Sequence, residues 1–75
     1  MYTLTDEQRK RLEINFVYHA PKVDQIVRYQ DIRDGAKRYA EFLMESCPNS
    51  RELSLALTAL EECVFWSNAS IARNE

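Results

Sequence analysis

The spacing of hydrophobic residues predicts two long amphipathic helices, over about residues 21–46 and 50–73. In both segments apolar positions recur every three or four residues, which places them on one side of a helix. In the first segment these positions are Ile26, Tyr29, Ile32, Ala36, Tyr39, Ala40, Leu43 and Cys47. In the second they are Leu53, Ala56, Leu57, Leu60, Val64, Ser67 and Ile71.

A shorter helix is predicted over residues 5–16. Thr5 followed by Gln8 has the spacing of a capping box, in which side chain and backbone bond reciprocally at a helix start. Pro21 ends this region, because a residue that precedes proline disfavours the helical conformation. Proline itself suits the first position of the next helix, so we expect that helix to begin at Pro21.

The two long helices are joined by the tight turn Cys47-Pro48-Asn49-Ser50. Asn49 is predicted to cap the last helix, with Glu52 completing a capping box. Helices joined by so short a turn pack antiparallel, which places residue i roughly opposite residue 98−i. The fold class expected is therefore all-α, with residues 1–75 forming one domain: a short helix followed by a two-helix hairpin.

Both long helices carry more apolar residues than one shared seam can cover. The surplus forms a second stripe on each helix: Leu55, Ala59, Trp66 and Ala69 on one, and Val23, Val27 and Phe42 on the other. An isolated hairpin that exposes these residues would be prone to association. We therefore expect a closed homo-oligomer; the alternative is a monomer in which the first helix covers both stripes.

Composition and charge narrow the classes of function. Net charge is -2, yet residues 8–38 hold eight Lys or Arg against four acids, whereas residues 39–75 hold two against six. This asymmetry indicates either a localised anionic ligand or self-association, and it argues against a surface that binds along DNA or RNA. No stretch is apolar enough for a signal peptide or a membrane span, so we expect no membrane partner.

The two cysteines and one histidine predict neither a metal centre nor a disulfide. A structural zinc site requires four ligands, so His19, Cys47 and Cys63 are too few, and no metal or cofactor is expected. In the predicted register the cysteines lie about 18 Å apart along the hairpin, too far for a bridge. Both are expected to be small buried residues.

Three residues stand out as candidates for ligand binding. Arg33 falls inside the apolar arc near Phe65, where a guanidinium needs a partner. It either reaches the rim, pairing with a carboxylate such as Glu62, or binds an anion such as phosphate. Tyr18 and His19 lie in the break before the second helix; an aromatic there either plugs the end of the hairpin or stacks on a nucleobase. No Ser, Cys or Asp lies at a spacing that suggests a catalytic triad with His19, so no enzyme activity is expected.

Four stretches of the sequence, taken in order, resemble a known phage family. They are Phe16–Pro21 (FVYHAP), Tyr29–Lys37 (YQDIRDGAK), Cys47–Glu52 (CPNSRE) and Trp66–Arg73 (WSNASIAR). Together they resemble the helical hairpin domain of anti-CBASS and anti-Thoeris sponge proteins over about residues 14–74. The resemblance implies a hairpin oligomer, often a hexamer, that binds cyclic di- and trinucleotides or cyclic ADP-ribose isomers without cleaving them.

The resemblance also implies roles for individual residues. Tyr18 matches an aromatic residue that stacks on a base, and Arg33 matches a basic position that holds a phosphate. Asn68 and Arg73 lie in the matching carboxy-terminal segment. The ligand-binding residues expected on this basis are Tyr18, His19, Arg33, Lys37, Asn68 and Arg73.

The function expected is sequestration of cyclic oligonucleotide messengers in the cytoplasm of the host bacterium. A helical adaptor or structural phage protein that binds another protein is the alternative from the residues alone. Because Tyr18 and Arg33 are fifteen residues apart, at about 1.5 Å per helical residue, we expect one ligand to contact Tyr18 and Arg33 from two different chains.

Overall fold

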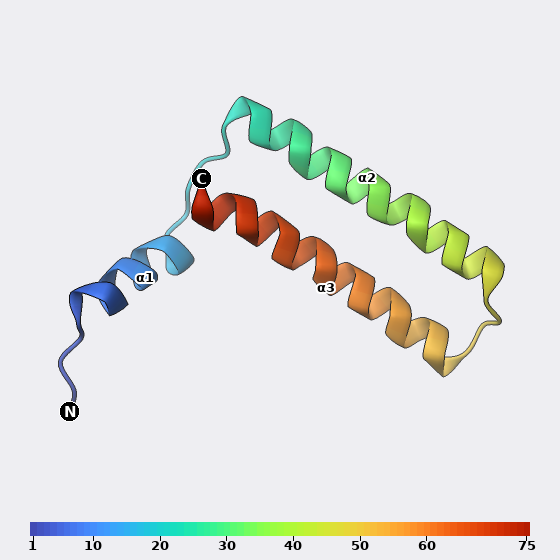
Figure 1. Ribbon diagram of the computed structural model, residues 1–75, viewed down its shortest axis with the longest axis horizontal. Helices are drawn as coiled ribbons and strands as arrows, with labels where there is room; N and C mark the ends of the chain where they lie inside the picture. Colours follow the sequence, from blue (N-terminus) through green and yellow to red (C-terminus); the bar gives the residue numbers. More distant parts are fainter.

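The protein consists of three helices and no strands, as a computed structural model describes for residues 1–75 (Figure 1). Helix α1 spans Asp6–Phe16, α2 spans Val23–Ser46 and α3 spans Arg51–Asn74. The four-residue turn 47–50 reverses the chain, so that α2 and α3 run antiparallel (Figure 1). The prediction of an all-α hairpin preceded by a short helix is confirmed.

The start of α1 agrees with the capping box predicted for Thr5. The Thr5 hydroxyl accepts a hydrogen bond from the Gln8 backbone N–H at 3.1 Å, and the Gln8 side chain accepts one from the Thr5 N–H at 2.9 Å. Two of the four unpaired N–H groups at this helix end are thereby satisfied.

The starts of the two long helices differ from the prediction by one or two residues. Helix α2 begins at Val23 rather than Pro21, because the Lys22 backbone stays extended and its N–H is bonded by the Gln25 side chain at 2.9 Å. Helix α3 is capped by Ser50 rather than Asn49. The Ser50 hydroxyl accepts the Leu53 N–H at 3.2 Å, so Glu52 closes no capping box.

The seam between α2 and α3 is shallow. Only two residues are buried, Leu53 near the turn (8% exposed) and Gln25 at the open end (5% exposed). The half-buried residues Ile32, Ala36, Ala40 and Leu43 of α2, and Leu57, Leu60, Val64 and Ile71 of α3, follow the predicted pattern. Several positions predicted for the seam are instead exposed: Ile26, Tyr39, Cys47 and Ala56. Cys63 is exposed as well, so neither cysteine is the buried residue that we expected, and both are free thiols.

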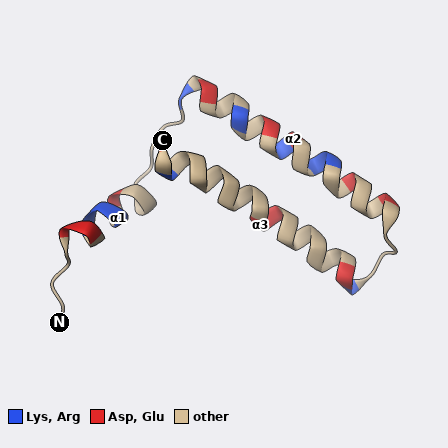
Figure 2. Ribbon diagram, viewed as in Figure 1, with Lys and Arg blue, Asp and Glu red and all other residues tan.

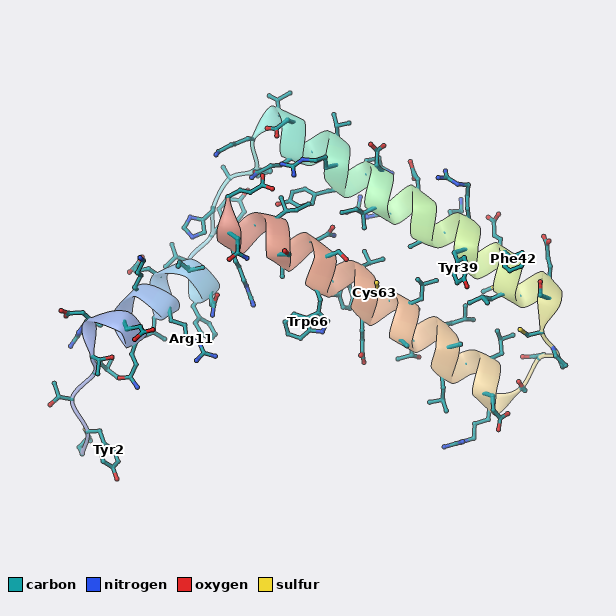
Figure 3. The ribbon with its side chains drawn as sticks, viewed as in Figure 1. Tyr2, Arg11, Tyr39, Phe42, Cys63 and Trp66 are labelled. Atoms are coloured by element: carbon teal, nitrogen blue, oxygen red, sulfur yellow. The ribbon has the colours of Figure 1, made fainter.

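The surplus apolar stripes remain uncovered in the single chain. Helix α1 extends away from the open end of the hairpin and contributes no buried residue (Figure 1). Trp66 points away from α2 (Figure 3) and is 67% exposed, and Leu55, Val27 and Phe42 are each more than half exposed. The alternative in which α1 covers both stripes is therefore wrong.

The chain is extended for its size. Its radius of gyration is 17.0 Å, compared with the ~11 Å expected of a compact domain of this length. Its accessible surface is 6584 Å², whereas a compact chain of 8.8 kDa exposes about 4,800 Å². About 1,800 Å² of surface beyond that of a compact monomer therefore remains in contact with solvent. No helix combines the length and apolar composition that a membrane span requires.

Candidate ligand-binding site

Two adjoining hollows lie at the open end of the hairpin, where the end of α1, the segment 17–22, the start of α2 and the end of α3 come together. Their volumes are about 510 Å³ and about 470 Å³. We call them together the open-end site. They share the lining residues Ile14, Tyr18, His19, Tyr29, Ala72 and Arg73. Five of the six residues predicted to bind ligand line this site.

Tyr18 and His19 are presented by the extended segment between α1 and α2. Tyr18 is 83% exposed, which leaves its ring accessible to a stacking partner. His19 Nε2 lies 3.2 Å from the Glu13 carbonyl oxygen. Because a carbonyl only accepts, Nε2 carries the proton, and the bond satisfies a carbonyl in the last turn of α1. Segment 17–22 is thereby tied to α1.

Arg33 and Arg73 bring positive charge to the site from two different helices. Arg33 is exposed and donates a hydrogen bond to the Gln30 side chain at 3.2 Å, and it forms no ion pair with Glu62 or any other acid. It reaches the rim of the apolar seam, as long basic side chains often do. Arg73 is exposed and likewise forms no ion pair. Both guanidinium groups keep donors available for an anion, which suits the paired oxygens of a phosphate.

Asn68 contributes a buried acceptor to the same hollow as Arg33. Its Oδ1 atom is shielded from solvent and accepts no hydrogen bond within the chain. A buried polar atom without a partner costs about 1–3 kcal/mol. An N–H or O–H group of a ligand or of a second chain at this place would remove that cost.

Tyr18 and Arg33 of one chain line the same hollow, which differs from our expectation. Our expectation treated the fifteen residues from Tyr18 to Arg33 as one straight helix. Segment 17–22 is instead extended and bends back toward the hairpin, and only ten residues of helix, about 15 Å, separate Val23 from Arg33. Tyr18 and Arg33 of a single chain therefore both border one hollow.

Lys37 is the one predicted ligand-binding residue that does not line the open-end site. It lines a groove of about 400 Å³ over the middle of the seam, together with Arg33, Ala40, Leu57, Val64 and Phe65. We call this the seam groove. Arg33 and Phe65 lie together in it, which agrees with the predicted register. Arg33 therefore borders two surfaces, and Lys37 only the second.

A cluster of polar residues at the edge of the open-end site was not predicted from the sequence. Arg28 donates to both carboxylate oxygens of Glu75 and also to Asp24 at 3.1 Å. Gln25 donates to Glu75 at 3.2 Å. The hydrogen bonds from Arg28, with a smaller contribution from Gln25, lower the pKa of Glu75 to about 2. The hydrogen bond with Glu75 in turn raises the pKa of Arg28. Arg28 is thus already neutralised, unlike Arg33 and Arg73.

The signals for this cluster are weak in the sequence. Tyr29, which lines the open-end site outside this cluster, was assigned to the seam, although it stands four residues before Arg33 and therefore on the same helix face. Gln25 follows Lys22 at the spacing of a helix-start glutamine. The predicted register places Glu75 opposite residue 23, but the contact with Gln25 and Arg28 also depends on the relative rotation of the two helices.

Charge is unevenly distributed over the molecule. Most Lys and Arg lie on α1 and α2, where Asp and Glu are interspersed with them, whereas α3 carries Arg51 and Arg73 near its two ends and three Glu between them (Figure 2). No group of three or more His, Cys, Asp or Glu side chains converges in a way that would hold a metal ion. The arrangement can stack on a planar ring, bind an anion and accept a hydrogen bond.

Comparison with known proteins identifies the family. No curated protein and no solved structure is significantly similar to the chain. The family described as the Acb2/Tad1 hairpin domain matches residues 8–72, which cover all of α2 and most of α1 and α3. The chain therefore belongs to the Acb2/Tad1 hairpin-domain family, which is the anti-CBASS and anti-Thoeris sponge family.

Proposed function

We propose that the protein binds and sequesters cyclic oligonucleotide messengers of bacterial anti-phage immunity, cyclic dinucleotides or cyclic trinucleotides, in the cytoplasm of the host. Membership of the sponge family supports an anti-defence role. The observation that carries the choice of ligand is the open-end site, where an exposed aromatic ring and two unpaired guanidinium groups border the same hollow. A cyclic oligonucleotide presents the complementary groups, flat bases and singly charged phosphates.

Each of the proposed contacts has a physical reason. Tyr18 stacks on a base, an interaction worth about 1–3 kcal/mol. Arg33 and Arg73 bind phosphate, since a planar guanidinium matches two phosphate oxygens. Asn68 accepts a hydrogen bond from the ligand and His19 borders the same hollow. Lys37 adds positive charge along α2 beyond the site.

We further propose that several copies assemble into a closed homo-oligomer. The family resemblance favours a hexamer. The excess of about 1,800 Å² over a compact monomer supports this, because stable protein interfaces bury about 1,200–2,000 Å² in total. The exposed residues Leu55, Trp66 and Phe42 are of the kind that interface cores use. Assembly would also place the seam groove, with Lys37, beside a neighbouring chain.

Binding is proposed to leave the ligand intact. His19, the only imidazole, has one nitrogen occupied by the Glu13 carbonyl, and no carboxylate is positioned beside the other. A binding protein of this kind acts by lowering the free concentration of messenger. The protein must therefore be present in excess of the messenger and bind it tightly.

A second candidate function has its own observation. The seam groove is mostly apolar and about 400 Å³ in volume, which suits an amphipathic segment of another protein. An adaptor role would use this groove and leave the open-end site unimportant. Substitutions at the two surfaces therefore distinguish the two functions.

Calorimetric titration with cyclic dinucleotides, cyclic trinucleotides and cyclic ADP-ribose tests the proposal. Arg73→Ala should weaken binding by about 1.5–3 kcal/mol, or ten- to a hundredfold, because a hydrogen bond to a charged group is lost. Arg38→Ala is the matched control, since Arg38 is exposed on α2 and lines none of these hollows. The proposal fails if the folded wild-type protein binds no member of the panel, or if both variants bind equally well.

A further inference from the structure

The open end of the hairpin is closed by side chains alone. At the other end the chain itself joins α2 to α3, but here the two helix ends are free to separate. Every hydrogen bond between a residue of α2 and one beyond the turn is made by Glu75, which accepts from Gln25 and Arg28. Arg28 also donates to Asp24, which holds its guanidinium in place beside Glu75.

Gln25 is the centre of this arrangement. It is the most buried residue of the chain, at 5% exposure, and the only polar residue that is buried. Its Oε1 accepts the Lys22 N–H at 2.9 Å, and its Nε2 donates to Glu75 at 3.2 Å. Both ends of the amide are therefore satisfied, as a buried polar group requires. One side chain thus joins the segment before α2 to the residue that follows α3.

These contacts lie directly beside the residues of the open-end site. Lys22 follows His19 by three residues, and Glu75 follows Arg73 by two. Lys22, Gln25 and Glu75 line the same hollow as Tyr18, His19 and Arg73. On its other side, segment 17–22 is tied to α1 through His19, and α1 contributes no buried residue. The position of Tyr18 relative to Arg73 therefore depends on Gln25.

We infer that Gln25, through its paired hydrogen bonds to Lys22 and Glu75, is a positioning residue that holds the segment carrying Tyr18 and His19 at a fixed place relative to Arg73, and so sets the affinity of the open-end site. Arg28 supports it by fixing the Glu75 carboxylate. The inference rests on the proposed function. Gln25 borders the hollow, but its amide is already bonded to Lys22 and Glu75.

Exchanging the amide of Gln25 with the carboxylate of Glu75 tests this inference. Gln25→Glu places a second carboxylate against Glu75, which breaks the contact by repulsion. The double variant Gln25→Glu with Glu75→Gln restores it with the donor and acceptor reversed, because Glu accepts from Lys22 and from the new amide, while that amide oxygen still accepts from Arg28. Net charge returns to that of the wild type. Gln8→Glu is the control, since it makes the same substitution in the capping box of α1, where Glu serves equally well.

Affinity for cyclic di-AMP and cyclic tri-AMP is measured by calorimetry, together with thermal unfolding, assembly mass and hydrogen exchange of residues 17–24. Gln25→Glu should weaken binding about tenfold or more, and the double variant should return it to within about threefold of wild type, at unchanged assembly mass. Amide exchange in residues 17–24 should accelerate in the single variant and recover in the double. If Gln25→Glu does not fold, Glu75→Ala removes the same contact at an exposed helix end and should give the same loss.

Two results would overturn the inference, and they differ from failure of the proposed function. Wild-type affinity in a folded Gln25→Glu or Glu75→Ala variant would reduce the cluster to a structural role. Weakened binding in Gln25→Glu that the double variant does not restore would also reduce the cluster to a structural role. If the wild type binds neither cyclic di-AMP nor cyclic tri-AMP, the proposed function fails for these two ligands. The positioning role is then decided by hydrogen exchange, and unchanged exchange of residues 17–24 in Gln25→Glu would refute that role.

Discussion

Replacing Trp66 with glutamate should dissociate the proposed oligomer. Trp66 points away from α2 (Figure 3) and is 67% exposed in the single chain. A tryptophan side chain buries about 150–250 Å², so roughly 100–170 Å² of it remains to be covered by a neighbouring chain. At about 25 cal/mol per Å², that area contributes roughly 2.5–4 kcal/mol to each contact, and desolvating the new carboxylate adds to the loss. The association constant should therefore fall at least about sixtyfold.

Sedimentation velocity over a range of concentrations measures this change, and circular dichroism checks that the helices remain. Tyr2→Glu is the matched control, because it also replaces an aromatic with glutamate but at a fully exposed residue before α1. The control should retain the wild-type mass, several times 8.8 kDa, whereas Trp66→Glu should shift toward the monomer. An unchanged mass for Trp66→Glu would exclude Trp66 from the interface. A wild-type monomer at micromolar concentration would refute self-association itself.

Three further predictions follow from single residues. Tyr18→Ala and Arg33→Ala should each weaken cyclic nucleotide binding by about 1–3 kcal/mol in calorimetry without lowering the melting temperature, because both side chains are exposed; unchanged affinity in both would remove them from the site. Because the pKa of Glu75 is lowered from 4.5 to about 2, its pairing with Arg28 stabilises the fold above about pH 4.5 and is lost as the pH falls toward 2. Glu75→Gln should therefore lower the melting temperature at neutral pH but have a diminishing effect below pH 4.5, and an equal effect at both would contradict the assignment. Gly35→Ala should stabilise the chain by about 0.5–1 kcal/mol in denaturant unfolding, since a methyl group there comes no closer than 3.9 Å to Arg38 and removes the entropic cost of glycine within a helix; destabilisation would show that another chain packs at Gly35.

The architecture could be predicted from the sequence because two strong patterns agree. The three-to-four spacing specifies helices, and a turn of four residues leaves antiparallel packing as the way to bury their apolar faces. The ends were less certain, since Asn49 and Ser50 are both good helix caps and differ by a single position. The start of α2 was misplaced because proline tolerates the first helical position, whereas here the Gln25 side chain caps the backbone at Lys22 instead.

The site could be predicted only in part. Exposed residues in a helix break, such as Tyr18 and His19, and a basic residue beside an apolar face, such as Arg33, carry a signal in the sequence alone. That Arg33 and Arg73 border the same hollow could not be predicted, because the register places Arg73 opposite residue 25, about 12 Å along α2 from Arg33. The register places Glu75 near the start of α2, but its hydrogen bond with Gln25 could not be predicted, because that bond depends on the rotation of two helices.

Recovery of intact messenger from an excess of protein tests the central claim most directly. Each cyclic di- and trinucleotide is mixed with excess protein, the free fraction is measured by filtration, and the bound fraction is released by heat and identified by chromatography. At least one cyclic oligonucleotide should disappear from the filtrate and return unchanged after heating. Filtrates that retain every ligand, or release of linear products in proportion to time, would contradict it.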